Sequence, residues 1–504
     1  MIQDSKKGLK VKLKHDIGKT GSLDIERKSL LFEYGLAGGF SDIVQNKVKH
    51  LRLSISDSEI NKRVDLRNKL IFTIDGDRAR DFDDAVGIQK LKNGYKLWVS
   101  IADVSHYVKL SSDIDTEAYR RATSVYLTKQ VVPMLPEKLS NNLCSLIPNE
   151  DRLTKTVEIV FDNGGNIKDY SVYRSVINSK YRLTYTRVSE ILNGLQGSDK
   201  SDKKLERSLF VMKELYLKIK KIRFEAGYID LNIPDAEIVQ DSHGKIVDII
   251  KLSRDIAHEL IEYFMITANQ VVAEFINKSK SDSIYRIHKS LKEDFVGELK
   301  EKLRNLGYKK KIRNKIEAKD IQDVLEYFKD TKQEYAANLF ILRTMNRAVY
   351  STNDVGHFGL GLKYYTHFTS PIRRYPDLVI HRILDSLLEK KGSIYDLDSL
   401  SKISSHCSEK ESFSDEVERE SMKLERAFLL KQHIGKIVKG IIISIQSFGL
   451  FVELNDIYAE GLILRKKIRD FDESKFHIGQ DITVKISNSD IDNRRVALDF
   501  VKLR

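Results

Sequence analysis

The spacing of hydrophobic residues changes several times along the chain, and each change predicts a different kind of element. Residues 70–74 form a largely apolar run that predicts a buried strand, and residues 97–104 alternate as a half-buried strand does. Residues 157–161 and the run that begins at Ile167 predict a hairpin, because Asn163-Gly164 supplies the positive φ angles of a tight turn. The first third of the chain is therefore expected to contain a β-sheet.

The middle of the chain has helical spacing, and the end returns to short β-rich runs. Helices are expected over residues 255–278, 334–349, 375–388 and, as a charged connector, 412–432. After Gly435, strands are expected over residues 437–445, 450–454, 459–464, 482–486 and 496–500. Five short strands in so little chain are typical of a small barrel such as the OB-fold.

These patterns divide the chain into three parts. Residues 1–67 are basic and polar and look like a short extension, residues 68–433 a large mixed domain, and residues 434–504 the barrel. The expected fold class is α+β, a large mixed domain followed by a small all-β OB-fold barrel.

Composition adds a preference for a partner. The chain has 86 Lys and Arg against 73 Asp and Glu, a net charge of +13 and a pI of about 9.2. This excess favours nucleic acid, although charge alone also fits simple solubility. Cys144 and Cys407 lie far apart without CxxC spacing, which argues against a disulfide framework or a thiolate zinc site. The chain shows no signal-peptide or membrane-span pattern, so we expect a cytoplasmic protein that does not enter a membrane. We also expect it to be a monomer.

The strongest chemical signal is a group of carboxylates directly after the first predicted strand. Asp75, Asp77, Asp81, Asp83 and Asp84 lie within ten residues. Like charges so close together repel, and a divalent cation would relieve that repulsion. Oxygen ligands without His or Cys suit Mg²⁺ or Mn²⁺, and two such ions can promote phosphodiester cleavage.

Two other interpretations compete with a metal site. An EF-hand loop that started at Asp75 would need Gly at its sixth position and Glu at its twelfth, but Arg80 and Val86 stand there, which excludes it. A solvated acidic turn stays open on charge alone. The strand before the cluster and Ala85-Val86 after it argue against an exposed loop.

The segment 74–86, IDGDRARDFDDAV, resembles the signature of the ribonuclease II/ribonuclease R family, whose members carry the RNB-type catalytic domain. Further segments match this family in the right order, over roughly residues 60–430: 101–105, 123–126, 133–136, 139–140, 143–146, 260–262, 285–288 and 367–375. Residues 435–440, 448–452 and 460–462 resemble the OB-fold RNA-binding module named after the largest protein of the small ribosomal subunit.

The resemblance implies an activity and a metal site. Family members are 3′-to-5′ hydrolytic exoribonucleases that bind the 3′ end of single-stranded RNA and release nucleoside 5′-monophosphates. Asp75, Asp81, Asp83 and Asp84 match the metal aspartates, with Mg²⁺ expected and Mn²⁺ as the other choice. Asp77, where the family usually has Glu, is expected outside the metal site. Arg373 matches a catalytic arginine, and the resemblance implies that Asp83 and Asp84 are catalytic as well. The alternative for Arg373 is a surface salt bridge, which is the commoner role of a lone arginine.

The resemblance also implies RNA contacts, each with a plainer alternative. Tyr126 and Tyr185 match tyrosines that contact RNA, Glu262 a glutamate that accepts from ribose hydroxyls, and Arg374 is a second basic contact or a structural partner. Core packing, or for Glu262 an ion pair on a helix surface, is the alternative. Phe448 and Phe451 fit a stacking platform on the barrel, although one of them fits its core equally well. His288 and His381 are expected to be structural.

One departure from the family stands at the N-terminus. Members usually carry two cold-shock OB domains there, whereas residues 1–67 hold at most the tail of one, over residues 11–31. A more open RNA funnel, and so lower processivity, is expected. The competing functions are a catalytically weak RNA-binding protein on a nuclease fold, and a carboxylate-metal endonuclease or phosphatase.

Overall fold

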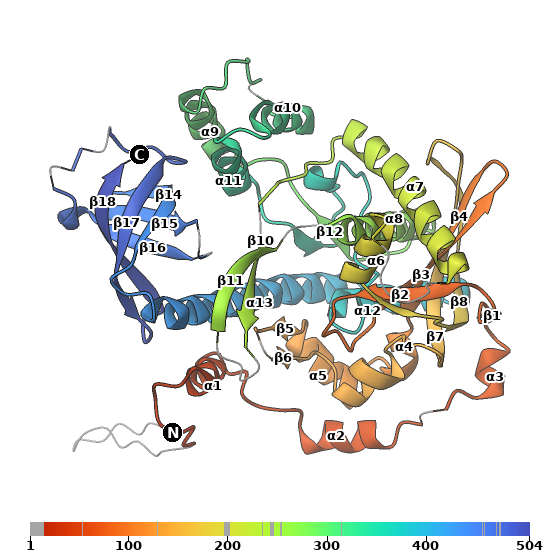
Figure 1. Ribbon diagram of the computed structural model, residues 1–504. Helices are drawn as coiled ribbons and strands as arrows, with labels where there is room; N and C mark the ends of the chain where they lie inside the picture. Colours follow the sequence, from red (N-terminus) through yellow and green to blue (C-terminus); the bar gives the residue numbers. More distant parts are fainter. Residues whose placement is uncertain are drawn as a thin grey trace.

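A seven-stranded mixed sheet forms the centre of the catalytic part (Figure 1). The computed structural model describes residues 15–503 except residues 53, 129, 196–201, 234, 242–245, 253, 254, 314, 456, 458, 470, 473 and 474. The sheet order is β1-β8-β7-β4-β3-β2-β9, and only the β1–β8 and β2–β9 pairs are parallel. Its strands are β1 (Val64–Asp65), β2 (Ile71–Asp75), β3 (Asp84–Leu91), β4 (Gly94–Ala102), β7 (Asp151–Phe161), β8 (Ile167–Asn178) and β9 (Arg182–Thr184).

The hairpin expected from the sequence is confirmed as β7 and β8. Its positive φ angle, 91°, belongs to Gly165, one residue beyond the Asn163-Gly164 pair that we expected to supply it. The side chain of Asp162 closes the turn by accepting a hydrogen bond from the Asn166 amide at 2.9 Å. The position of the positive φ angle was predicted one residue too early, because the Asp162 side chain helps to form the turn and the Asn-Gly dipeptide does not form it alone.

Helices cover both sides of the sheet (Figure 1). The helix predicted over 255–278 is confirmed as α8, and Asp255 caps it; the helix predicted over 375–388 is α12. The core of this part is a single cluster that includes Phe72, Tyr95 and Phe264. The helices here are α4 (Val104–Tyr107), α5 (Asp113–Arg121), α6 (Tyr185–Leu192), α7 (Lys203–Glu225), α8 (Ile256–Lys278) and α12 (Tyr375–Leu388).

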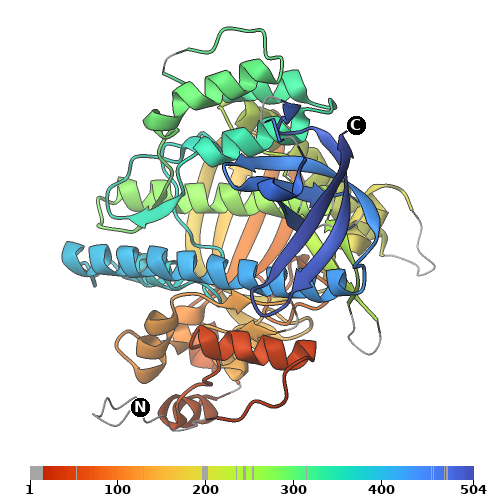
Figure 2. The same cartoon turned by 90° about the vertical axis from the view of Figure 1, so that its left-hand side faces the viewer.

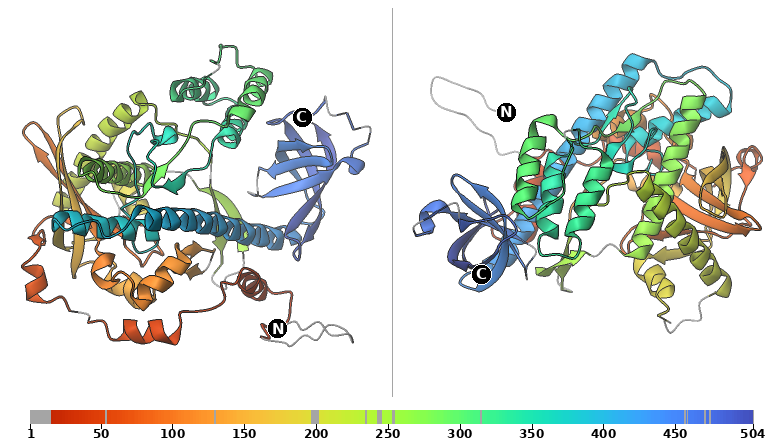
Figure 3. Two further views of the ribbon diagram at one scale, coloured as in Figure 1. Left: turned by 180° about the vertical axis from the view of Figure 1, so that it is seen from behind. Right: turned by 90° about the horizontal axis from the view of Figure 1, so that it is seen from above.

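Three helices form a group of their own above the long helix described below (Figures 1 and 3). They are α9 (Glu293–Asn305), α10 (Ala318–Phe328) and α11 (Glu334–Thr344), and they share a separate core with Leu303 and Ile341. The prediction of a helix over 334–349 was too long. Val349–Ser351 instead forms strand β13, which pairs with β12 (Tyr285–Ile287), so tertiary pairing overrides helical spacing there.

One helix, α13 (Leu397–Lys431), runs from the catalytic part to the barrel (Figures 1 and 3). It begins 15 residues before the predicted start at 412. All five predicted strands of the barrel are confirmed, and they close in the order β14-β15-β16-β18-β17 (Figure 2). They are β14 (Ile437–Gln446), β15 (Gly449–Leu454), β16 (Glu460–Leu464), β17 (Asp481–Asp490) and β18 (Arg495–Leu503).

The described residues of the N-terminal part before β1 contain three short helices. Residues 11–14 of the proposed cold-shock remnant lie outside the described residues. Residues 15–31 contain the start of α1 (Leu23–Glu33) and no strand, so the expectation of a barrel remnant is wrong for these residues. Helix α1 packs on α13, where Arg27 forms an ion pair with Glu425 at 2.6 Å. The neighbouring helices are α2 (Asp42–Lys49) and α3 (Asp57–Ile60).

Short elements complete the fold: β5 (Val125–Tyr126), β6 (Val131–Val132), β10 (Asp235–Gln240), β11 (Ile246–Leu252), the π-helical turn η1 (Leu139–Leu143) and the 3₁₀ turns η2 (Phe358–Leu360) and η3 (Arg465–Lys467). Within the described chain, every helix is too short or too polar to cross a membrane.

Candidate active site

The aspartate loop leaves strand β2 and is fixed at several points. The Ser145 hydroxyl accepts from the Phe82 amide at 3.0 Å and donates to the Arg80 carbonyl at 2.7 Å. Arg182 donates to the carbonyls of Gly76 and Asp77, at 2.8 and 2.7 Å. A loop tied down in this way is not the freely solvated acidic turn that charge alone left open.

Four of the five loop carboxylates line one pocket of about 670 Å³, and Asp77 does not. Asp75, Asp81, Asp83 and Asp84 face this pocket, whereas Asp77 is exposed. Burial, reinforced by the neighbouring aspartates, raises the pKa of Asp75 to about 9. Burial likewise raises the pKa of Asp84 to about 6 and that of Asp83 well above its usual range. The chain itself therefore compensates ionised carboxylates poorly in this pocket, and without a cation they tend to hold protons.

The chain compensates some of these carboxylates and leaves one without a partner. Asp83 Oδ1 accepts from the Ile372 amide at 2.8 Å, and its Oδ2 lies 3.4 Å from Arg373 Nε. Asp81 Oδ2 accepts from the Tyr126 hydroxyl at 3.3 Å. Asp75 Oδ2 is buried without any hydrogen-bond partner among the described residues. An orphaned buried carboxylate oxygen calls for a cation.

The donor set suits a hard divalent ion, because it consists of carboxylate oxygens alone. In the described part of the chain, no group of three His, Cys, Asp or Glu side chains is arranged to hold a metal ion as it stands. Asp81 and Asp83 are instead directed toward Tyr126 and Arg373. The residues fit the ion by their chemistry and by the unpartnered oxygen of Asp75.

Two neighbouring arginines behave differently. The Arg373 side chain lines the pocket and is 43% exposed. Its Nη2 donates a hydrogen bond to the Ser370 hydroxyl at 2.9 Å. Arg374 also lines the pocket, but it is held by the fully buried carboxylate of Asp377 at 2.7 Å. Arg373, whose ion pair with Asp83 is the longer of the two, is therefore the more accessible to a ligand, and Arg374 is committed to the turn that carries both.

The remaining sequence-predicted residues separate into two places. Tyr126, Tyr185 and Glu262 line the same pocket as the aspartates. Phe448 and Phe451 lie on the barrel, where their rings are 6.0 Å apart at 87°, and neither lines this pocket. Phe448 is 52% exposed and Phe451 half-buried, so Phe448 is the better stacking surface of the two.

The two histidines that we expected to be structural are both engaged with backbone. His288 accepts from the Gly359 amide through Nδ1 at 3.0 Å and contacts the Asn346 carbonyl through Nε2 at 2.7 Å. His381 contacts the Phe368 carbonyl through Nε2 at 2.9 Å and stacks on the Phe368 ring. Neither lines the aspartate pocket.

Sequence reasoning missed two residues of the pocket wall. Arg286 forms a two-pronged ion pair with Glu411 of α13, at 2.6 and 3.0 Å, and so ties the pocket to the long helix. Asn269 accepts from the Phe368 amide at 2.8 Å and fixes the segment that leads to Arg373. Its position seven residues after Glu262, on the same face of a predicted helix, is the signal that would have found it.

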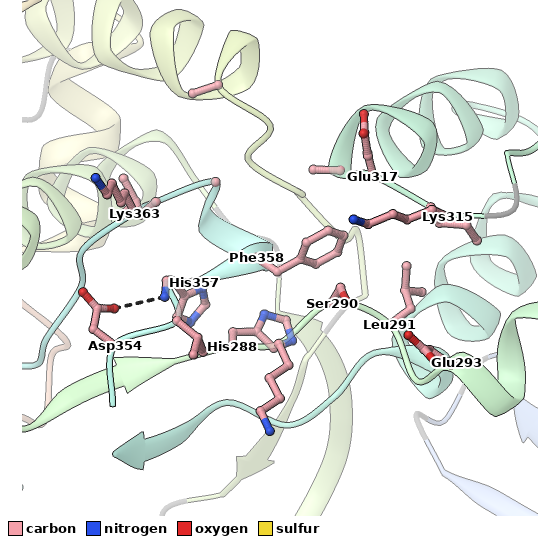
Figure 4. A pocket seen from close by; sticks show the side chains of 18 of the residues that line it. His288, Ser290, Leu291, Glu293, Lys315, Glu317, Asp354, His357, Phe358 and Lys363 are labelled. Atoms are coloured by element: carbon pink, nitrogen blue, oxygen red, sulfur yellow. Dashed lines mark hydrogen bonds between the residues drawn. The ribbon is translucent and has the colours of Figure 1, made fainter. Parts of the chain in front are cut away.

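A larger cleft of about 1750 Å³ adjoins the aspartate pocket, and His357 lines both (Figure 4). Its wall carries Phe358 and Lys315, which approach each other in Figure 4, and Asp354 on the other side of His357. Among the described residues that line this cleft there is no counterpart of the aspartate group. Size alone therefore does not mark the catalytic site, and the carboxylates do.

Comparison with known proteins places both parts of the chain in known families. The RNB domain family matches residues 63–390, and the S1 RNA binding domain matches residues 431–500. Ribonuclease R of Aquifex aeolicus is 39% identical over 491 residues, which cover 94% of this chain and 70% of the relative. Ribonuclease R of Escherichia coli is 36% identical over 485 residues, 91% of this chain and 60% of the relative. The chain belongs to the ribonuclease R family.

Two solved structures have the same fold over most of this chain. RNase R from Mycoplasma genitalium, in complex with ribose methylated single-stranded RNA, has a TM-score of 0.91 at 32% identity, over 96% of this chain and 79% of that one. Yeast Ssd1, described as a pseudonuclease, has a TM-score of 0.71 at 19% identity, over 94% of this chain and 59% of that one. That likeness shows the fold alone. The family recognised from the sequence is confirmed, and with it the exoribonuclease class of this enzyme.

Proposed function

We propose that the chain hydrolyses single-stranded RNA stepwise from its 3′ end and releases nucleoside 5′-monophosphates at the Asp75–Arg373 pocket. The observation that carries this proposal is the meeting of Asp75, Asp81, Asp83 and Asp84 with Arg373 in one pocket that also contains Tyr126, Tyr185 and Glu262. Carboxylates for metal ions, an arginine for phosphate and aromatic rings for bases are the groups that such a reaction requires.

The carboxylates would hold divalent ions, Mg²⁺ or Mn²⁺. Two ions bound there would supply the charge that activates water and stabilises the leaving oxygen. Binding them would draw Asp81 from Tyr126 and Asp83 from Arg373, which frees both side chains for RNA. The released Arg373 guanidinium has the planar shape for two-pronged contact with a phosphate.

The other residues orient the strand. Tyr126 and Tyr185 would stack on bases near the 3′ end, and Glu262 would accept from a ribose 2′-hydroxyl, which favours RNA over DNA. Phe448 and Phe451 on the S1 barrel would hold RNA farther from the scissile bond. We place the enzyme in the cytoplasm and propose that it acts as a monomer.

A single carboxylate tests the proposal. Asp83→Asn keeps the acceptor for the Ile372 amide but removes a charge from the metal site. With 5′-labelled single-stranded RNA and Mg²⁺, the wild-type enzyme should shorten the labelled strand in single-nucleotide steps. Asp83→Asn should bind the RNA without shortening it. Asp77→Asn is the matched control, because Asp77 belongs to the same loop but is exposed and does not line the pocket.

The alternatives give different products. Internal fragments would indicate an endonuclease, and binding without cleavage by the wild type would indicate a catalytically weak RNA-binding protein. Cleavage by Asp83→Asn at the wild-type rate would show that the carboxylate pocket is not the catalytic site.

A further inference from the structure

Tyr185 does not stand alone in the pocket, because an imidazole ring covers one of its faces. The rings of Tyr185 and His258 are stacked, with centroids 3.9 Å apart and planes 20° from parallel. Tyr185 is the first residue of α6 and His258 the third residue of α8, so the stack joins two helices. His258 is not among the described residues that line the pocket, and it therefore backs Tyr185 from outside.

The His258 ring is itself held in place. Its Nδ1 lies 2.7 Å from Asp255 Oδ1 and donates to it. The same oxygen accepts from the backbone amides of Ala257 and His258, both at 3.0 Å. Asp255 thus caps α8 and fixes the imidazole with one carboxylate oxygen, which restricts rotation of the ring.

The pair has features that ordinary core packing does not require. The His258 side chain is 35% exposed, so it adds little to the buried core. Nearly parallel stacking covers one face of Tyr185, and because Tyr185 also lines the pocket, the face away from His258 is the one that a stacking base would meet. A planar ring that is fixed from behind presents that face in one orientation, which lowers the ordering cost when a base stacks on it.

We propose that His258 is a positioning residue that holds Tyr185 in the orientation in which its free face stacks on a nucleobase of the bound RNA. This inference rests on the proposed role of Tyr185 as an RNA contact. His258 touches neither the RNA nor the reacting atoms; it acts through Tyr185, and Asp255 fixes its ring.

The test measures base stacking directly. Single-stranded RNA carries 2-aminopurine at one position at a time, counted from the 3′ end, and binds to the Asp83→Asn enzyme with Mg²⁺. Stacking on Tyr185 quenches the fluorescence at one position, and Tyr185→Leu should abolish that quench. His258→Leu should reduce the quench at the same position, whereas His258→Phe, which keeps a planar ring, should retain most of it. In the catalytically active enzyme, His258→Leu should raise KM for short RNA about 3- to 10-fold, with kcat much less affected.

A second His–Tyr pair provides the matched control. His406 lies over Tyr119 with centroids 4.5 Å apart, and neither ring lines the pocket. His406→Leu should therefore leave the quench unchanged. A loss of the quench in His406→Leu would mean that His258→Leu acts by destabilising the fold and not through Tyr185, and it would contradict the proposal. The proposal is overturned if His258→Leu keeps the full quench, or if His258→Phe is as damaging as His258→Leu. If Tyr185→Leu itself keeps the quench, the role of Tyr185 and this inference both fail, while the nuclease assignment still rests on Asp83.

Discussion

Arg373 Nε lies 3.4 Å from Asp83 Oδ2, and the amide of the preceding residue, Ile372, donates to Asp83 Oδ1 at 2.8 Å. One carboxylate therefore joins the aspartate loop to a turn almost 300 residues later, since Ile372 is 289 positions from Asp83. The backbone contact fixes the turn, and the side-chain contact is the weaker of the two. Arg373 can leave Asp83 for a phosphate while the turn stays in place.

Arg373→Ala should therefore affect the chemical step more than binding. Removing a charged donor that stabilises the transition state lowers kcat by about 100- to 1000-fold, and KM should change far less because Tyr126 and Tyr185 remain. Steady-state kinetics on a short single-stranded RNA measures both constants. Arg78→Ala, at an exposed arginine of the aspartate loop, is the control. A fall in affinity as large as the fall in kcat would assign Arg373 a binding role only.

Removal of divalent ions should abolish activity and lower stability together. Because the four pocket aspartates repel one another, excess Mg²⁺ should raise the melting temperature of the chelator-treated protein; an ion at 100 times its Kd stabilises a fold by about 2.7 kcal/mol. Differential scanning fluorimetry measures this rise. Asp75→Asn should reduce it strongly, and Asp77→Asn should keep it. An equal rise in both variants would place the ion outside the pocket.

The aspartate pocket and the barrel could be predicted because their signals are local. Asp75, Asp81, Asp83 and Asp84 lie within one short segment after a recognisable strand, and the barrel strands are separated by clear breaks in hydrophobic pattern. The sequence order of the motifs then identified the family. None of these steps required knowledge of which distant segments meet.

The parts that were missed depend on contacts between distant segments. The first half of α13 is rich in serine, and its helix is stabilised by tertiary burial of Leu400, Ile403 and Cys407. The shortening of α11 follows from pairing of β13 with β12. Arg286 is held at the pocket wall by its ion pair with Glu411, which is 125 residues away in the sequence. Periodicity carries no information about such partners.

Buried neutral histidines should stabilise the fold less as the pH falls. Burial lowers the pKa of His357 and of His381 to about 3, and it also lowers that of His288. In the unfolded chain these groups titrate near 6.5, so between about 6.5 and 3 the unfolded state binds more protons than the folded one. The contribution of each such histidine to the free energy of unfolding should therefore fall as pH decreases through this window, by up to about 1.4 kcal/mol per pH unit. Asp75, Asp83 and Asp84 contribute in the opposite direction, because burial raises their pKa.

Urea unfolding at a series of pH values, in a chelator to exclude metal effects, measures this dependence. The wild type should be more stable than His381→Gln near neutral pH, because the Phe368 carbonyl and ring lose their partner in the variant. This difference in the free energy of unfolding should shrink as the pH falls toward 3. His433→Gln is the control, since His433 is only half-buried at the end of α13. A pH dependence that is unchanged in His381→Gln would contradict the assignment.

A substitution of Phe448 distinguishes the contribution of the barrel to RNA binding from that of the pocket. It is 52% exposed and lies outside the catalytic pocket, so it can contact only RNA that is long enough to reach the barrel. Phe448→Ala should weaken binding of long single-stranded RNA by about 1–3 kcal/mol, the usual value of one base stacked on an aromatic ring. Cleavage of an RNA just long enough to fill the pocket should be unaffected. Ile437→Ala removes an exposed apolar side chain from the same barrel without removing a ring, and it should change neither. Equal losses for long and short RNA in Phe448→Ala would show that the substitution disturbs the catalytic part, because stacking on the barrel cannot act on a strand that does not reach it.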